Sequence, residues 1–425
     1  MKKYKAYKDS GIDWIGDIPE QWVLTPLKYC VNCNEISLGE DTPENFLIEY
    51  IDIGSVTLED GVVTTQAFFF KDSPSRARRI VKEGNVIVST VRTYLKAIAR
   101  IKIQQANLIA STGFAVLSAK NILNPGFLYY FCISNGFVND VNSISKGVSY
   151  PSVTASDLLK LQICIPALHE QSQIGQYLDH KIAEIDKLIT DKGRLIELLN
   201  DERTAVINQA VTKGLDLSVP MKNSGIEWYG EMPSHWHLKR MKYLCEIGTG
   251  DKDTENREAD GAYPFYVRSD TIERISTYSF DGEAILTAGD GVGVCKVWHY
   301  VTGKFDYHQR VYRMSDFSEV LGRYLFYYLK ENFEKEVKKL SAKSTVDSLR
   351  RPMFQNFLVA FGSKDEQLSI INFIEMEESR INSITEKIID EIRLLTEYKT
   401  ALISEAVTGK VDVRNEVIAE SIITA

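Results

Sequence analysis

The sequence contains no apolar run long enough to span a bilayer, and its opening stretch, MKKYKAYKDSG, has no apolar segment of the signal-peptide type. We therefore expect a soluble, cytoplasmic protein with no membrane partner. Cysteine is scarce and scattered, at Cys30, Cys33, Cys132, Cys164, Cys245 and Cys295. Free buried thiols explain this pattern best. The CVNC pair has the spacing of metal ligands, but no second pair completes a tetrahedral site, so we expect no metal.

Motifs of catalysis are also absent. The sequence has neither the phosphate-binding GxxxxGK[ST] loop nor the zinc-binding HExxH pair. An adenine methyltransferase would carry Asn-Pro-Pro-aromatic, and the nearest approach, Asn124-Pro125-Gly126, is more simply a turn before an aromatic helix. The GDGVG segment at 289–293 is too short for a dinucleotide loop and indicates a tight hairpin or a close approach of backbone to DNA. We expect no catalytic residue and no cofactor in this chain.

Positive charge is low overall but locally concentrated. The formal net charge of −8 argues against a protein that coats nucleic acid through bulk positive charge. Residues 71–102 nevertheless hold nine Lys or Arg against two acids, and residues 296–351 hold twelve against seven. A site-specific nucleic-acid binder needs such local basic stretches, one in each half of the chain.

A long amphipathic helix pattern occurs twice, at 170–216 and at 366–412, with a constant offset of 196 residues. Its apolar positions follow the three-and-four spacing of a coiled-coil seam. In the first copy they are Leu178, Ile182, Ile185, Ile189, Ile196, Leu199, Val206 and Ala210, and in the second Ile374, Ile381, Ile388, Ile392, Leu395, Leu402 and Ala406. Polar residues interrupt the seam at Lys192, Arg203, Glu378, Thr385 and Lys399. One such stripe alone would favour an ordinary core helix, but two matched copies favour a helix pair.

A second repeat shows that the whole chain is duplicated. SGIDWIGDIP at 10–19 returns as SGIEWYGEMP at 224–233, and LKY at 27–29 returns as MKY at 241–243, both 214 residues later. Joining the end of the chain to its beginning reproduces the order found in its middle, so we expect the two ends to lie close together. The returning helix must then run antiparallel to the first, as a spacer of roughly 60 Å.

The predicted fold is α+β, with two mixed α/β domains separated by an antiparallel two-helix coiled coil and related by a pseudo-twofold internal repeat. Strands are expected near Tyr50 and Tyr263 and at 85–91, 114–118, 283–288 and 310–315, and short aromatic helices at 127–131 and 325–329. The predicted boundaries are 1–22 for an N-terminal segment, 23–166 for the first variable domain, 167–214 for the first helix, 215–236 for a linker, 237–362 for the second variable domain, 363–414 for the second helix and 415–425 for a tail.

These repeated segments, together with VRTYLK at 91–96 and the HEQ and DEQ helix starts, resemble the specificity subunit of type I restriction-modification systems. The resemblance implies two target recognition domains that read the two halves of a bipartite target in double-stranded DNA. It also implies partners: two modification subunits that methylate adenine with S-adenosylmethionine, and restriction subunits that use ATP and Mg. The cofactors would belong to the partners. We expect the helix faces and the SGIxW segments to dock the modification subunits.

Two other classes of protein remain open at this point. A coiled-coil scaffold without DNA recognition would explain the helices but not the two basic domains. A self-sufficient nuclease or methyltransferase would need the missing motifs.

The candidate DNA contacts lie in polar, basic loops of the two variable domains. In the first domain they are Arg92, Lys96, Lys146, Ser149, Tyr150 and Ser152, and in the second Lys296, His308, Gln309, Arg310, Lys343, Ser344, Thr345 and Arg350. Arg92 is the candidate for bidentate reading of guanine and Gln309 for adenine, whereas the lysines are candidate phosphate contacts. For each of them the alternative is a solvated surface residue.

Overall fold

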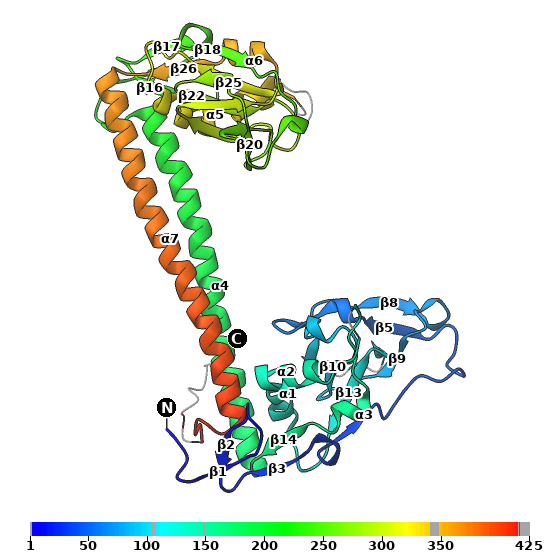
Figure 1. Cartoon of the computed structure of the whole chain (residues 1–425). Coiled ribbons are helices and arrows are strands. Elements are labelled where there is room, and N and C mark those ends of the chain that lie inside the picture. The colour runs from blue at the N-terminus through cyan, green and yellow to red at the C-terminus, as the bar shows by residue number, and fades with distance from the viewer. Residues whose placement is uncertain are drawn as a thin grey trace. The chain divides into compact units, whose positions relative to one another are not determined.

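The computed structural model describes residues 2–103, 105, 107–147, 149–340, 348–414 and 416. Contacts divide the chain into two compact units, Met1–Lys192 with Asp390–Ala425, and Gly193–Ile389. We call them unit 1 and unit 2. Each contains one end of both long helices, α4 (Leu168–Lys213) and α7 (Lys364–Val407) (Figure 1). Within the described part of the chain, no helix is long and apolar enough to cross a membrane.

The helices α4 and α7 pack together in antiparallel directions. In unit 1 Lys399 pairs with Asp186 at 2.6 Å and Lys192 with Glu391, while in unit 2 Arg380 pairs with Glu202 at 2.6 Å. The residue numbers rise along one helix as they fall along the other, as the sequence predicts.

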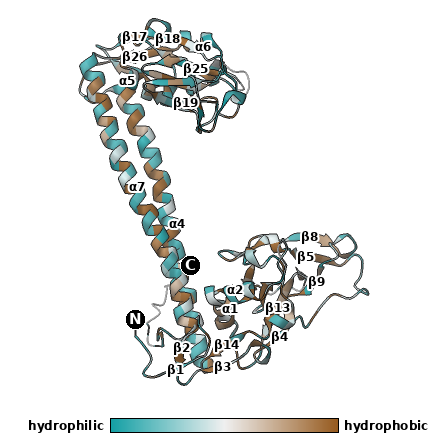
Figure 2. Cartoon of the chain, in the orientation of Figure 1, coloured by the Kyte–Doolittle hydropathy of each residue, from teal (hydrophilic) through white to brown (hydrophobic). Residues whose placement is uncertain are grey.

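The polar interruptions of the seam have partners of their own. Lys192 and Lys399 form the ion pairs across unit 1, and Arg203 donates to Asn382 at 2.6 Å in unit 2. Most of the predicted apolar positions are buried, and Figure 2 shows hydrophobic and hydrophilic residues alternating along both helices. The helix pair therefore combines an apolar seam with polar contacts that fix its register.

Unit 1 contains two four-stranded sheets. The first has the order β11-β10-β13-β4 and the second β8-β5-β12-β9, with β5 and β12 parallel. All four residues of β10 are buried, which accounts for its continuous apolar sequence. The strands are β4 (Val31–Cys33), β5 (Leu47–Ile51), β8 (Gln66–Phe69), β9 (Ala77–Ile80), β10 (Val86–Ser89), β11 (Ile98–Arg100), β12 (Leu108–Ser111) and β13 (Phe114–Ala119).

Unit 2 repeats this topology with different side chains. Its sheets have the orders β18-β25-β22-β23 and β20-β19-β24-β21, and β19 is parallel to β24. The strands are β18 (Glu246–Thr249), β19 (Tyr263–Tyr266), β20 (Ile272–Ile275), β21 (Phe280–Asp281), β22 (Ala284–Ala288), β23 (Trp298–Val301), β24 (Lys304–Tyr307) and β25 (Val311–Ser315). Thus β10 and β11 of unit 1 correspond to β22 and β23 of unit 2. The six predicted strands are confirmed as β5, β10, β13, β19, β22 and β25.

Smaller elements complete both units. The two-stranded pairs are β1 (Tyr7–Asp9) with β2 (Asp17–Pro19), β3 (Val23–Pro26) with β14 (Gln162–Ile165), β6 (Val56–Thr57) with β7 (Gly61–Val62), β15 (Met221–Asn223) with β16 (Glu231–Pro233), and β17 (His237–Arg240) with β26 (Leu358–Phe361). The short helices are α2 (Asn135–Ser143), α3 (Ala155–Leu158) and α6 (Arg351–Asn356), and the 3-10 turns are η1 (Leu27–Tyr29), η2 (Ile53–Ser55), η3 (Phe70–Asp72), η4 (Thr93–Leu95), η5 (Met241–Tyr243) and η6 (Thr254–Asn256).

The aromatic helices differ in length between the units. Helix α1 (Pro125–Ile133) is short, as predicted, and Asn124 caps it by accepting from the backbone N–H groups of Gly126 and Phe127. Helix α5 (Gly322–Leu340) has 19 residues, so the prediction of a short helix in unit 2 is wrong. The charged residues after Leu329 continue the helix, and Phe333 and Val337 extend its buried face.

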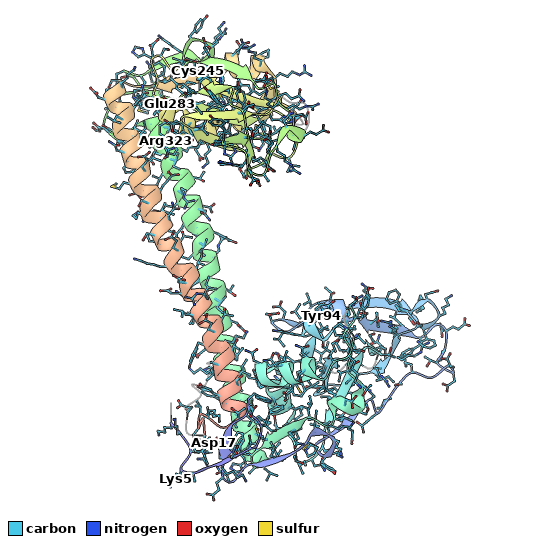
Figure 3. The ribbon with its side chains drawn as sticks, in the orientation of Figure 1. Lys5, Asp17, Tyr94, Cys245, Glu283 and Arg323 are labelled. Carbon is cyan, nitrogen blue, oxygen red and sulfur yellow. The ribbon has the colours of Figure 1, made fainter. Side chains whose placement is uncertain are left out.

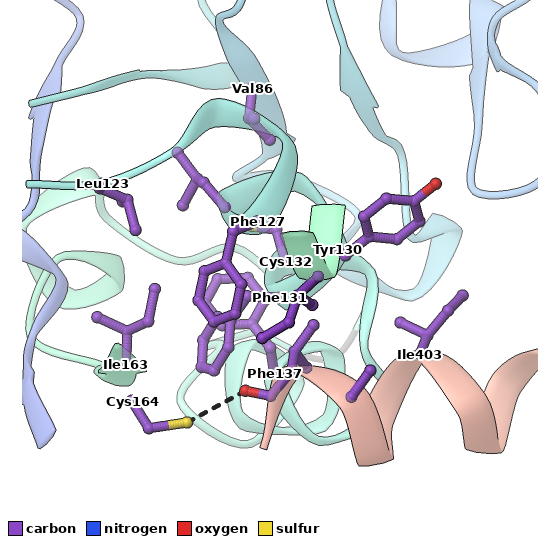
Figure 4. Packing of buried hydrophobic residues seen from close by; sticks show 14 of the residues in the cluster. Val86, Leu123, Phe127, Tyr130, Phe131, Cys132, Phe137, Ile163, Cys164 and Ile403 are labelled. Atoms are coloured by element: carbon purple, nitrogen blue, oxygen red, sulfur yellow. Dashed lines mark hydrogen bonds between the residues drawn. The ribbon is translucent and has the colours of Figure 1, made fainter. Parts of the chain in front are cut away.

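The core of unit 1 combines aliphatic residues with aromatic rings and buried cysteines. Phe127 and Phe131 of α1 pack with Phe137 of α2, and the Cys164 thiol donates to the Val407 carbonyl oxygen at 3.3 Å (Figure 4). All six cysteines are free, and all but the half-buried Cys33 are buried. Among the described residues, no three His, Cys, Asp or Glu side chains gather as a metal-binding group.

The dipeptide Glu-Gln at the start of each long helix ties the helix to its unit. In unit 1 the buried Gln171 amide accepts from the Asn124 N–H at 2.7 Å and donates to the carbonyl oxygens of Ile122 and Pro166 at 3.0 and 2.9 Å. Gln367 of unit 2 repeats this arrangement with Leu321, Glu319 and Gly362, at 2.7, 3.1 and 3.0 Å.

The glutamates beside these glutamines hold the two repeated tryptophans. The Trp22 indole N–H donates to Glu170 at 3.2 Å, and the Trp236 indole N–H donates to Glu366 at 2.8 Å. The Glu366 N–H also donates to the Ser363 hydroxyl oxygen at 3.2 Å, which forms one half of a capping box. The other half is missing because the Glu366 carboxylate faces Trp236.

The two ends of the chain meet in unit 1. Lys2 and Asp412 form a backbone bridge, in which the Asp412 N–H donates to the Lys2 carbonyl oxygen at 2.9 Å. Arg414 pairs with the Asp412 carboxylate and lies over the Tyr4 ring, 4.8 Å from its centroid. The meeting of the ends, expected from the repeat, is confirmed.

Replacing Gln171 by Ala should lower the free energy of unfolding by ~2–3 kcal/mol, because one backbone N–H and two carbonyl oxygens lose a buried partner. Gln367→Ala should have a similar effect through unit 2. Urea denaturation of each variant measures the change. Gln173→Ala is the matched control, since Gln173 is exposed on the same helix. Equal stability of Gln171→Ala and the control would contradict the anchoring role.

Candidate nucleic-acid interface

In unit 1 the connection from β10 to β11 forms a tight projecting turn. Arg92 and Lys96, at its two ends, have left-handed backbone conformations with φ of 51° and 49°, and η4 lies between them. Residues other than glycine adopt this backbone conformation at a cost of about 1–3 kcal/mol, which other contacts must offset.

The loop at 146–153 supplies those contacts. Lys146 and Ser152 exchange two backbone hydrogen bonds of 2.8 and 2.9 Å, and the Arg92 N–H donates to the Pro151 carbonyl oxygen at 2.8 Å. The buried Thr93 hydroxyl lies 3.0 Å from the Ser145 hydroxyl. The two segments, about sixty residues apart in sequence, therefore form one rigid surface.

This surface gathers most of the residues predicted for the first domain. Arg92, Lys96, Lys146, Ser149 and Tyr150 are exposed. The Arg92 guanidinium carbon lies 5.1 Å from the centroid of the Tyr150 ring, which pre-orients the cation. Ser152 is half-buried and contributes its backbone to the bridge with Lys146.

Unit 2 has a corresponding surface at the connection from β22 to β23. Asp290 and Ser348 form a backbone bridge, and the Leu349 N–H donates to the Gly289 carbonyl oxygen at 2.7 Å. This matches the bridge between Val91 and Ser152 of unit 1. The GDGVG segment is a turn of this connection, in keeping with the tight hairpin that the sequence suggests.

Two arginines of this surface share one carboxylate. Arg268 pairs with Asp290 at 3.0 Å, and Arg310 pairs with the other oxygen of the same carboxylate. Burial alone would raise the pKa of the Asp290 carboxyl, but hydrogen bonds and charge from Arg310 and Arg268 outweigh it and hold that pKa below its ordinary value. Asp290 thus remains ionised and orients both guanidinium groups, leaving a net positive charge.

The structure places the side chain of His308, a candidate DNA contact, inside unit 2. The His308 side chain is 2% exposed, and its Nδ1 accepts from the Arg310 N–H at 2.9 Å. Burial lowers the pKa of His308, and the arginines 268 and 310 lower it further against the attraction of Asp253. The neutral ring supports the turn from inside and presents no edge to a ligand.

The other residues predicted for the second domain have mixed surroundings. Gln309 is exposed, and its amide donates one hydrogen bond to the Asp253 carboxylate at 2.6 Å, which engages one of its two N–H groups. Lys296, Arg310 and Arg350 are exposed. Lys343, Ser344 and Thr345 lie outside the described residues.

Comparison with known proteins gives these surfaces a family. Residues 48–198 and 233–394 match Methylase_S, the type I restriction modification DNA specificity domain. Together the two matched segments cover most of the chain, and one of them falls in each half of the repeat. The chain belongs to this family.

Relatives and solved structures agree with this assignment. The chain is 25% identical to the type I restriction enzyme EcoDI specificity subunit of Escherichia coli over 181 residues, 43% of this chain and 40% of that protein. The matched segments span about half or less of the curated relatives, 40% and 54% for the first two.

Two solved structures share the fold of the specificity subunit. The HsdS subunit from Thermoanaerobacter tengcongensis aligns with a TM-score of 0.60 and 20% identity, over 93% of this chain and 98% of that chain. A chain from a structure that describes complex assembly and conformational transition of the type I R-M system aligns with a TM-score of 0.75 and 19% identity, over 93% and 99%.

Sequence reasoning missed Arg268 and Asp290, which the structure places beside Arg310. A signal for Arg268 was available, because it follows directly after the apolar strand near Tyr263, where loop residues of a recognition sheet begin. Asp290 could not be found this way, since its role depends on two arginines that are distant in sequence.

If Arg92 reads a base, Arg92→Ala should weaken specific DNA binding by ~1–3 kcal/mol and relax the preference at one base pair. Lys96→Ala should instead weaken binding to all sequences and lower the slope of log affinity against log salt by about 1. Titrations of target and non-target duplexes at several salt concentrations separate the two effects. Unchanged affinity and preference in Arg92→Ala would remove Arg92 from the interface.

Proposed function

We propose that this chain is the sequence-reading, noncatalytic subunit of a type I restriction-modification complex, and that each unit reads one half of a bipartite target in double-stranded DNA. The observation that carries the proposal is that one structural feature occurs in both units. Two sheets of the same topology each present a connection, after β10 and after β22, that is braced by the segment preceding α3 or α6. Basic side chains lie at both connections, Arg92 and Lys96 within the first, and Arg268 and Arg310 paired with Asp290 of the second.

The chemistry of the two surfaces differs as two half-sites require. Unit 1 offers one stacked arginine, Arg92, with two lysines, whereas unit 2 offers the pair Arg268 and Arg310 on a shared aspartate. Guanidinium groups read guanine edges, and lysines contact phosphates without regard to sequence. Two unlike surfaces on one frame favour an asymmetric target.

The competing class, a scaffold without DNA recognition, gives no reason for these surfaces. Such a protein would need the helix pair alone, and the left-handed residues Arg92, Lys96 and Cys295 in the two connections would cost stability without any function to offset it. A self-sufficient nuclease or methyltransferase is disfavoured by the sequence, which lacks the corresponding motifs. The complex would act in the cytoplasm on chromosomal DNA, and S-adenosylmethionine, ATP and Mg would bind to its modification and restriction subunits.

For docking of two modification subunits, the repeated exposed side chains are the best candidates. Tyr29 of η1 and Tyr243 of η5 hold the same place in the repeat, both are largely exposed, and the ammonium groups of Lys28 and Lys242 lie 4.9 and 4.8 Å from their ring centroids. Surfaces that recur in both halves suit a partner that is present twice.

The SGIxW tryptophans suit this docking role less well than the sequence suggests. Trp14 donates to Asp140 at 2.6 Å and packs on Phe131, and Trp228 donates to Glu336 at 2.6 Å and stacks on Phe357. Their indole rings bind the unit itself, so any partner contact through this segment would use other atoms.

The function is tested by sequencing genomic adenine methylation in the host with and without this gene. One bipartite methylated motif should disappear with the gene. An identical pattern of methylation in both strains would contradict the proposal.

The docking surface is tested in the same system by affinity capture of the tagged chain. Tyr29→Ala with Tyr243→Ala should recover less modification subunit, whereas the control Tyr94→Ala, also an exposed tyrosine, should recover the wild-type amount. Equal recovery in both variants would remove the two tyrosines from the docking surface.

A further inference from the structure

The projecting turn of unit 1 carries apolar side chains at its tip. Tyr94 is 54% exposed and Leu95 is 43% exposed, between the left-handed Arg92 and Lys96. Figure 3 shows Tyr94 on the end of the unit away from Lys5 and Asp17. The turn is rigid, because the Leu95 and Lys96 N–H groups donate to the Arg92 and Thr93 carbonyl oxygens at 2.9 and 3.0 Å. A rigid backbone holds these side chains outward instead of letting them fold back onto the core.

The corresponding connection of unit 2 carries Val292, which is 92% exposed. In the same connection Cys295 has a left-handed backbone conformation with a φ of 59°. A Cβ on Gly289 would lie 2.8 Å from the Arg310 carbonyl oxygen, and one on Gly293 would lie 2.3 Å from the Arg268 carbonyl oxygen. The two glycines therefore let the turn pack closely on the segments that bear the two arginines.

Single exposed apolar residues are ordinary on protein surfaces. The positions of Tyr94, Leu95 and Val292 are unusual, because they lie in corresponding turns of the two units. The turns join corresponding strands, β10 to β11 and β22 to β23, in units whose loop sequences differ. Each turn is braced by the same kind of backbone bridge, to Ser152 or to Ser348. Both turns therefore share an exposed apolar side chain at the tip, although the residue itself differs.

Charge around both tips identifies the class of ligand. Arg92, Lys96 and Lys146 surround the tip of unit 1, and Lys296, Arg268 and Arg310 belong to the surface of unit 2. Cations of this kind hold phosphates on either side of a groove. Within the major groove, the apolar group that base pairs offer is the 5-methyl of thymine.

We propose that Tyr94 and Leu95 in unit 1 and Val292 in unit 2 are specificity-determining residues that contact thymine methyl groups in the major groove. The inference rests on the proposed function and deepens it, because it names the base-pair feature that each tip reads. Val292 has no hydrogen-bonding group in its side chain and a short reach, so an apolar contact is the one form of reading open to it. Tyr94 and Leu95 offer a larger apolar surface from the same position.

The experiment uses the full chain assembled with its modification subunits and a pool of random-sequence duplexes. Bound duplexes are selected and sequenced for the wild type, for Leu95→Ala and Tyr94→Ala, and for Val292→Ala. Ile122→Ala and Ile272→Ala are matched controls, because both are exposed apolar residues of the same units outside the two turns. The unit 1 variants should lose preference for a T·A pair in one half of the target, Val292→Ala should lose it in the other half, and the controls should select the wild-type motif.

Uracil in place of each thymine of the selected duplex then isolates the methyl group. Wild-type affinity should fall about fourfold at a contacted thymine, the effect of one buried methyl group. Val292→Ala should show no further loss at its own position, since the contact is already gone.

The outcomes separate this inference from the function on which it rests. If the wild-type complex selects no motif, the proposed function fails. If it selects a bipartite motif that the turn variants share unchanged, or if uracil costs nothing at every thymine, the function stands and the apolar contacts are refuted. A half-site without any T·A preference in the wild type refutes the assignment for the unit concerned.

Discussion

The fold depends on the hydrogen bonds made by one buried glutamine side chain at the start of each long helix. Gln171 and Gln367 are buried, and each closes three hydrogen bonds to backbone that precedes an aromatic helix or the long helix itself. An amide left without these partners would carry a desolvation cost that exceeds the gain of an average hydrogen bond. The two glutamines therefore fix the sheets of each unit to its helix, and the apolar seam between α4 and α7 adds packing to a geometry already set.

A shared frame with unlike surfaces follows from this arrangement. The frame comprises the Trp–Glu contacts, the Glu-Gln helix starts, the helix seam and the strand order, all of which occur in both units. The surfaces after β10 and β22 share position and bracing but not side chains. Recognition can then change through a few loop residues, because the contacts that hold the fold lie elsewhere.

The sequence allowed the fold to be predicted well because the repeat supplied two copies of every signal. The helix pair and its antiparallel direction followed from the repeat, and six strands followed from short apolar runs rich in β-branched and aromatic residues. The length of α5 was not predictable in this way, since its later turns are rich in Lys and Glu and only Phe333 and Val337 mark the buried face. The predicted domain boundaries stay a prediction.

The candidate site was predictable in part, for reasons that differ between residues. Arg92, Lys96 and Lys146 lie in polar, basic segments, and their closeness to one another comes from backbone hydrogen bonds that no local pattern reveals. His308 faces inward although the next two residues, Gln309 and Arg310, are exposed, because its ring accepts a hydrogen bond from the Arg310 N–H. No local sequence pattern reveals this contact. Arg268 and Asp290 act together with Arg310, and such a triad needs the fold to be seen.

The proposed function requires each unit to read its own half-site independently. The most direct measurement exchanges residues 23–166 for the corresponding domain of a family member with a different known target, and then determines the methylated motif of the hybrid complex. One half of the motif should change to that of the donor, and the other half should be retained. A change in both halves, or in neither, would contradict it.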